Sequence, residues 1–153
     1  MGQLFEAVTN FFEEDEWNFL EIENGRVLRL DITLENSDYT CYAFIDEEEH
    51  IFRFYSICPV KVPLKQRLLL AEFLTRVNYG LRIGNFEMDF EDGDIRYKTS
   101  IDVEGERLTP PFVKHLVYNN LSVMDNYLPG IMKVIYGGMS PEDAIAEIEK
   151  SEE

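Results

Sequence analysis

Hydrophobic and polar residues recur along this chain with two periods, one typical of helices and one typical of strands. Across residues 3–12 the apolar positions are spaced by three, four and seven, which predicts a short amphipathic helix. Residues 17–23 and 26–34 flank Asn24-Gly25, a dipeptide typical of a two-residue β-hairpin turn because it tolerates positive φ. Every second residue is apolar from Leu28 to Leu34, so we expect this strand to bury one face.

Two further strands and a helix follow the hairpin. Turn-forming residues at 36–38 and a charged turn at 47–49 precede strands at 39–46 and 50–57, which completes a four-stranded antiparallel meander. Pro59 and Pro63 end the meander, and residues 64–79 then carry the apolar stripe of a helix.

The rest of the chain predicts a second hairpin and two helices. Alternating strands at 83–90 and 95–103 flank the acidic turn 91–94. A long apolar stripe starts at Pro110-Pro111 and is interrupted by Pro129-Gly130, which predicts a kinked or broken helix, and a short helix follows Ser140. The pattern therefore predicts one α+β domain over residues 1–153, an antiparallel sheet packed with helices in the order α-ββββ-α-ββ-α-α.

The chain is strongly acidic. Its 153 residues include 14 basic and 30 acidic side chains, which gives a formal net charge of −16. Because nucleic acid and anionic lipid need a basic footprint, we expect no nucleic-acid partner and no membrane partner. Basic or apolar protein surfaces fit better, although solubility alone also accounts for the charge. Arg96, Lys98 and Arg107 could form a small basic stripe, which we interpret as a solvated face of the sheet.

The sequence gives no indication of export or of a membrane span. The first residues lack a basic region, and no uncharged apolar run approaches the roughly 18 residues that a span needs. Cys41 and Cys58 are the two cysteines, and neither belongs to a CxxC pair. We therefore expect a protein of the reducing cytoplasm.

Catalytic and metal-binding motifs are missing from the sequence. His50 and His115 lie far apart and have no nucleophile motif beside them. The acidic clusters at 13–16, 46–49 and 91–94 do not match the calcium loop of an EF-hand, since Gly93 at its sixth position would put Thr99 at the twelfth, where a carboxylate is needed. No glycine pattern indicates a phosphate loop. We therefore expect no catalytic residue, no metal and no cofactor, and a function that is not enzymatic.

Aromatic residues on the meander exceed what one buried face of a sheet needs. They predict an interaction surface formed by Tyr42, Phe44, Phe52, Phe54 and Tyr55. Helices that cover both faces of the sheet, or a homodimer interface, would account for the excess equally well.

Several segments resemble the YbjN family of bacterial proteins. They are YTCYAF at 39–44, FRFY at 52–55, RVNYG at 76–80, GNFEMD at 84–89, VIYGG at 134–138 and SPEDA at 140–144. The resemblance implies the fold of type III secretion chaperones, which are small, acidic, commonly dimeric proteins that hold extended client segments against apolar patches. The family also carries the label of a sensory transduction regulator. It has no established set of site residues to match with this sequence.

These observations favour a homodimeric, chaperone-like adaptor that binds a protein client of unknown identity. The alternative is a regulatory or sensory domain that binds a small ligand between the sheet and the long helix, near Tyr97, Tyr127 and Tyr136.

Overall fold

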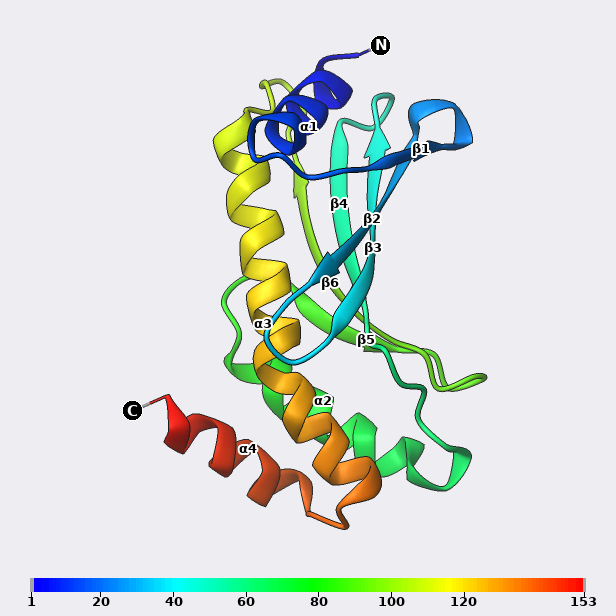
Figure 1. The fold of residues 1–153 in the computed structure, drawn as a ribbon, viewed down its shortest axis with the longest axis vertical. Helices are drawn as coiled ribbons and strands as arrows, with labels where there is room; N and C mark the ends of the chain where they lie inside the picture. The colour runs from blue at the N-terminus through cyan, green and yellow to red at the C-terminus, as the bar shows by residue number, and fades with distance from the viewer. Residues whose placement is uncertain (1, 153) are drawn as a thin grey trace.

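Six antiparallel strands form one sheet in the computed structural model of the protein, which describes residues 2–152 (Figure 1). The strands are β1 (Leu20–Ile22), β2 (Val27–Thr33), β3 (Asp38–Asp46), β4 (Ile51–Ile57), β5 (Asn85–Met88) and β6 (Ile95–Asp102). Their order across the sheet is β1-β2-β3-β4-β6-β5. The predicted meander is therefore confirmed, and the second hairpin extends it because β6 pairs with β4.

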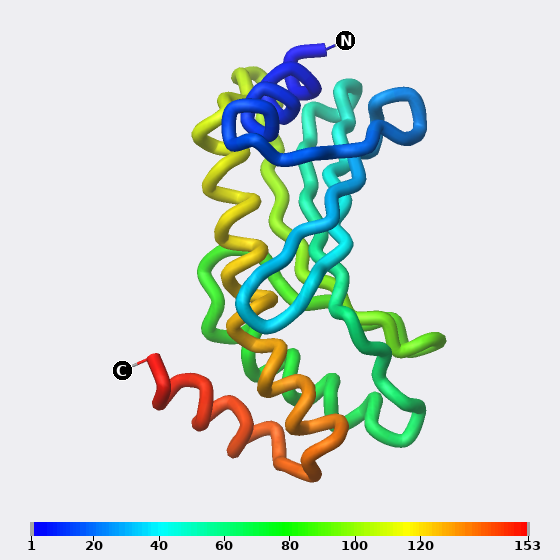
Figure 2. Tube along the Cα trace, viewed as in Figure 1, coloured from blue at the N-terminus to red at the C-terminus, as the bar shows by residue number. Residues whose placement is uncertain are grey.

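The helices of residues 2–152 are α1 (Gln3–Glu14), α2 (Arg67–Gly80), α3 (Pro110–Tyr136) and α4 (Pro141–Ser151), of which the first three contact the sheet and α4 packs on α2 and α3. Single 3₁₀ turns lie at Glu23–Gly25 and Leu64–Gln66. Figure 1 shows α1 and α3 along one side of the sheet, with α2 and α4 around the far half of α3. In the trace of Figure 2 the N-terminal helix lies at one end of α3 and the C-terminal helix at the other. The predicted fold class and element order are confirmed.

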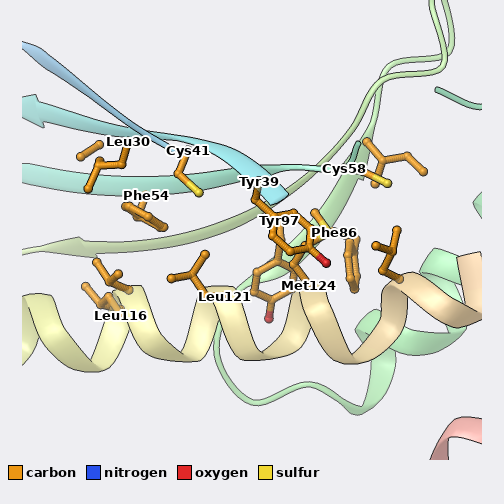
Figure 3. Close-up of a cluster of buried hydrophobic side chains, with 14 of the residues drawn as sticks. Leu30, Tyr39, Cys41, Phe54, Cys58, Phe86, Tyr97, Leu116, Leu121 and Met124 are labelled. Carbon is orange, nitrogen blue, oxygen red and sulfur yellow. The ribbon is translucent and has the colours of Figure 1, made fainter. Parts of the chain in front are cut away.

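The core lies between the helices and one face of the sheet. Along β4 the residues Phe52 and Phe54 point to this side and are fully buried, and Tyr97 does the same on β6. Figure 3 shows side chains of the sheet opposite Leu116 and Met124 of α3. Each strand buries one of its two faces. The alternation of apolar and polar residues in the sequence therefore corresponds to the buried and exposed faces of the sheet.

A buried amide joins α3 to the middle of the sheet. The side-chain nitrogen of Asn120 donates to the backbone oxygens of Phe54 on β4 (2.8 Å) and Tyr97 on β6 (2.9 Å). Its Oδ1 accepts a hydrogen bond from Ser56 Oγ at 2.6 Å. Asn120 and Ser56 are both fully buried. Since a buried polar group without partners is unfavourable by about 1–3 kcal/mol, these bonds fix where α3 lies on the sheet.

The predicted interruption of α3 does not break the helix, which runs unbroken for 27 residues with Pro129 inside it. Proline has no N–H to donate to the carbonyl four residues earlier, which belongs to Asp125. Asn36, in the turn between β2 and β3, supplies the missing donor: its Nδ2 lies 2.8 Å from Asp125 O. The Asp125 carboxylate also accepts from Asn36 N at 3.1 Å and from the hydroxyl of Tyr39 at 2.7 Å.

The two-residue turn predicted at Asn24-Gly25 is wrong in its length. Ile22 pairs with Val27, so the loop has the four residues from Glu23 to Arg26. Arg26 does not pair with β1, because its backbone oxygen accepts a hydrogen bond from Ile45 N of β3 at 2.8 Å. Positive φ at three successive residues closes the loop, and Gly25 adopts that conformation without strain.

The strand predicted from residue 17 begins later, at Leu20. Trp17 instead packs against α1 and α3: its ring stacks on Phe12 with centroids 5.8 Å apart and meets Tyr118 edge-on at 5.3 Å. Aromatic packing at the end of the core therefore takes precedence over strand pairing at this point.

We predict that Asn36 and Pro129 are energetically coupled. Asn36→Ala removes the donor to Asp125 O and lowers the free energy of unfolding by about 1 kcal/mol. In a Pro129→Ala background the restored backbone N–H makes that bond, so the same change has a smaller effect, with a coupling of about 0.5–1 kcal/mol. Urea unfolding of the four proteins measures the cycle.

Ser37→Ala is the matched control, because Ser37 lies in the same turn and its hydroxyl bonds to the neighbouring Asp38 carbonyl. Equal losses from Asn36→Ala in both backgrounds would show that the amide does not replace the proline donor.

Candidate interaction surface

The five aromatic residues predicted to form an interaction surface divide between the two faces of the sheet. Phe52 and Phe54 are fully buried and face the helices. Tyr42, Phe44 and Tyr55 point to the opposite face, because side chains alternate along β3 and β4 and Tyr42 pairs with Tyr55. The structure therefore leaves Tyr42 and Phe44 as candidates for contact with a partner, whereas Tyr55 lies on the same face but is buried.

We call the sheet face turned away from the helices the open face. Cross-strand pairing arranges its central residues in three rows, which are Leu20, Arg29, Tyr42, Tyr55, Lys98 and Asn85; Ile22, Val27, Phe44, Arg53 and Ser100; and Ile57, Arg96 and Glu87. In Figure 1 this face lies on the side away from α1 and α3.

Two arginines lie over the aromatic rings of the open face. The guanidinium carbon of Arg96 is 4.3 Å from the centre of the Tyr55 ring, and that of Arg53 is 4.9 Å from the centre of the Phe44 ring. Phe44 meets Tyr55 edge-on at 5.4 Å, and Arg53 Nη1 donates to the Tyr55 hydroxyl at 3.2 Å. Tyr55 is only 3% exposed as a result, so cation–π contacts cover rings that no helix covers.

An apolar groove lies beside these rings. It has a volume of about 280 Å³ and is lined by Ile22, Val27, Tyr42, Phe44, Tyr55 and Ile57, together with Glu23, Asp94 and Arg96. Pockets that hold drug-sized ligands or cofactors are about 300–1,000 Å³ and enclose most of the ligand. The groove is therefore suited to one large apolar side chain rather than to a cofactor.

Cations and carboxylates share the open face: Arg29, Arg53, Arg96 and Lys98 lie there with Asp31, Asp38, Asp46, Asp102 and Glu87. Glu87 accepts from both Arg96 Nε at 2.7 Å and Lys98 Nζ at 3.1 Å. Partial burial raises the pKa of the Glu87 carboxyl, but these two hydrogen bonds outweigh it and hold the pKa below its usual value. Arg29 has an exposed partner in Asp31 at 3.5 Å. No carboxylate of residues 2–152 lies within 4.0 Å of the Arg53 guanidinium.

The histidines and cysteines are not brought together into a reactive site. His50 in the β3–β4 turn and His115 on α3 are both exposed. Burial, with a smaller contribution from Asp31, raises the pKa of the Cys41 thiol to about 12, and burial raises that of Cys58 to about 11, so both thiols stay protonated at neutral pH. Within residues 2–152 no three His, Cys, Asp or Glu side chains gather as metal ligands.

The acidic turn between β3 and β4 has a structural role. The Glu47 carboxylate accepts hydrogen bonds from the backbone nitrogens of Leu4 at 3.1 Å and Phe5 at 2.9 Å, in the first turn of α1. A carboxylate is favourable at a helix N-terminus because it satisfies free N–H groups and the helix dipole.

In the described part of the chain, no helix has the length and apolarity of a membrane span.

The three tyrosines predicted to line a small-ligand pocket do not share one. Tyr97 is buried and donates to Ile83 O at 2.5 Å, whereas Tyr136 is 64% exposed at the end of α3. Tyr127 lines a groove of about 670 Å³ on the outer side of α3, which also includes Asn36 and Tyr118.

Sequence reasoning missed Arg53, although its place is readable from the pattern. Arg53 alternates with Tyr55 on β4 and therefore shares its face, and the β3–β4 pairing puts it opposite Phe44. The signal is a charged residue between aromatic residues on a strand. A strand register set by the predicted charged turn would have shown that Arg53 lies opposite Phe44.

Comparison with known proteins shows both family and fold. The family model described as "YbjN: Putative bacterial sensory transduction regulator" matches residues 5–132. No curated protein sequence is significantly similar to the chain.

Several solved structures share the fold, and the following three are among them. The crystal structure of E. coli YbjN, described as "a putative transcription regulator", has a TM-score of 0.57 and 15% identity, and covers 86% of this chain and 87% of its own. The HopA1–SchA chaperone–effector complex has a TM-score of 0.52 and 20% identity, with coverages of 80% and 91%. The Yersinia pestis type III secretion chaperone SycH, in complex with a stable fragment of YscM2, has a TM-score of 0.51 and 9% identity, with coverages of 79% and 96%.

We predict that the two faces of β4 and β3 respond differently to truncation. Phe54→Ala opens a cavity in the core and should lower the free energy of unfolding by about 3–5 kcal/mol, whereas Phe44→Ala on the open face should lower it by about 1 kcal/mol. Urea unfolding followed by tyrosine and tryptophan fluorescence measures both. Similar losses from the two changes would show that Phe44 belongs to the core and contradict the assignment of the open face.

Proposed function

The chain belongs to the YbjN family, and on that premise we propose that it is a protein-binding adaptor that acts by contact and without catalysis. The single observation that carries this proposal is the open face of the sheet, where an apolar groove lies beside aromatic rings that no helix covers. Two solved structures of the same fold are chaperones in complex with other proteins, which supports a polypeptide partner. The buried, protonated thiols and the separated histidines supply no nucleophile or base.

We propose Tyr42 and Phe44, which lie beside the buried Tyr55, as the centre of the surface that holds the client. Aromatic residues with an arginine beside them are the side chains most enriched at the energetic centre of protein interfaces. Strand faces also suit an extended segment, whose side chains alternate with the same period as the sheet. The free, buried cysteines fit a reducing compartment, and we propose the cytoplasm as the place of action.

A homodimer is the second part of the proposal, and the outer face of α2 supports it. Leu68 and Tyr79 are eleven residues apart on α2, which places them on one helix face, and Leu64 precedes them in the 3₁₀ turn Leu64–Gln66. The exposed fractions of Leu64, Leu68 and Tyr79 are 76%, 81% and 96%. The opposite face of α2 is buried in the core through Leu70, Phe73, Leu74 and Val77. A second copy of the chain would cover the outer face by symmetric contact of the same leucines.

Native pull-down followed by mass spectrometry tests the adaptor function. The wild-type chain should recover the same polypeptides reproducibly, and the double variant Tyr42→Ser/Phe44→Ser should lose them because the apolar groove is opened. Tyr136→Ser is the matched control, since Tyr136 is an exposed tyrosine at the end of α3. Recovery of the bait alone, or of the same polypeptides by the double variant, would contradict the proposal.

Light scattering tests the dimer. The wild-type chain should give twice its 17.9 kDa monomer mass, and Leu64→Glu/Leu68→Glu should return the monomer because paired carboxylates cannot be buried there. Phe112→Glu provides the control, as Phe112 is 52% exposed at the start of α3. A wild-type monomer at working concentration would exclude the dimer.

A further inference from the structure

We propose that the groove on the outer side of α3 binds a linear aliphatic polyamine, whose ammonium groups pair with Glu35, Asp125 and Glu152 and whose methylene chain lies on aromatic rings. We call this groove, which runs from Trp17 to Tyr127, the α3 groove. It shares no lining residue with the apolar groove of the open face, so the inference does not depend on the adaptor function.

The α3 groove has the size of a small-ligand site. Its volume is about 670 Å³, within the range of about 300–1,000 Å³ that is usual for such sites. Helix α3 supplies most of its lining residues, and the segment after α1, the β2–β3 turn, Leu81 and the end of α4 supply the others. Leucines and aromatic rings give it apolar surface on which a methylene chain can be buried.

Every charged residue that lines the α3 groove is acidic. Glu35, Asp125 and Glu152 line it, and no lysine, arginine or histidine does. None of the three carboxylates lies within 4.0 Å of a cationic group of residues 2–152. Asp125 accepts hydrogen bonds from Asn36 N and the Tyr39 hydroxyl, which are neutral donors and leave its charge uncompensated.

The charges that flank the lining residues are of both signs. They are Arg82, Lys114 and Lys150 on one side of the balance and Asp15, Glu16 and Glu149 on the other. Lys114 is turned to the Tyr118 ring, with its Nζ 5.9 Å from the ring centre, while the Tyr118 hydroxyl donates to Asp15 at 2.7 Å. Because these flanking charges balance, the three lining carboxylates determine the sign of the field in the groove.

The titration of Tyr127 agrees with a negative field at its end of the groove. Burial raises the pKa of the Tyr127 hydroxyl, and the carboxylates of Glu152 and Glu149 raise it further. A cation is therefore favoured here over a neutral ligand or an anion.

Aromatic rings at both ends of the α3 groove favour a long organic cation. Trp17 and Tyr118 meet edge-on at 5.3 Å at one end. Tyr127 lies nine residues after Tyr118 on α3, which corresponds to roughly 13.5 Å along the helix axis. Ammonium groups and the methylene groups beside them bind favourably to aromatic rings. A linear polyamine alternates the two groups and can reach both ends, whereas a compact metal ion finds no three gathered carboxylates within residues 2–152.

The fluorescence of Trp17 tests this inference on the full chain, because Trp17 is the only tryptophan and lines the α3 groove. Titration with spermine at about 150 mM salt, which screens diffuse attraction to the acidic surface, should give a saturable change. Calorimetry should give one spermine per chain. Putrescine, a short diamine, should bind about tenfold more weakly or less, and magnesium chloride should give no saturable change.

Neutralisation of the lining carboxylates assigns the binding to the groove. Glu35→Gln/Glu152→Gln should weaken spermine binding about tenfold. Glu104→Gln/Glu106→Gln is the matched control, because it changes the net charge equally in the exposed loop after β6 and should leave the affinity unchanged. Circular dichroism confirms that both variants are folded.

Each contrary outcome overturns a stated part of the inference. The absence of a saturable change, or equal affinity for putrescine and spermine, overturns the polyamine site. Equal losses from the two double variants would show diffuse attraction to an acidic chain. Tighter binding of an acetylated tetralysine amide than of spermine would assign the groove to a basic polypeptide instead. The pull-down with Tyr42→Ser/Phe44→Ser concerns the open face, so it decides the adaptor function independently.

Discussion

The contact between Asn120 and the centre of the sheet is the constraint on which the rest of the architecture depends. One amide bonds the backbones of β4 and β6 and the hydroxyl of Ser56, so α3 can lie on the sheet in one position. The other helices then pack on α3 or beside it, on the same side of the sheet. This buried polar cluster therefore fixes the position of α3 on the face of the sheet that the apolar residues make the core.

The open face shows how an acidic protein stabilises apolar residues without a covering helix. Arginine stems and guanidinium groups lie on Phe44 and Tyr55, which removes the rings from water while the charge stays solvated. The same face also holds carboxylates, so its cations lie among charges of both signs.

The strand alternation made most of the fold predictable, because a period of two identifies strands and their buried faces without knowledge of the tertiary structure. The same period places Phe54 and Tyr55 on opposite faces of the sheet. The prediction of one surface that contains both residues is inconsistent with that alternation. Contacts between distant segments could not be read from the sequence. Nothing near Pro129 indicates that Asn36 would supply its missing donor, and nothing near Asn24 indicates that Arg26 would bond to β3.

The bond between Asn36 and Asp125 also bears on the order in which the chain can fold. As an isolated segment, the second half of α3 starts at a proline with an unsatisfied carbonyl before it, which disfavours a continuous helix. Completion of the helix requires the β2–β3 turn, which lies 89 residues away in sequence. The hydrogen bonding of α3 at Pro129, and with it the half of the helix on which α4 packs, therefore depends on a contact that is non-local in sequence.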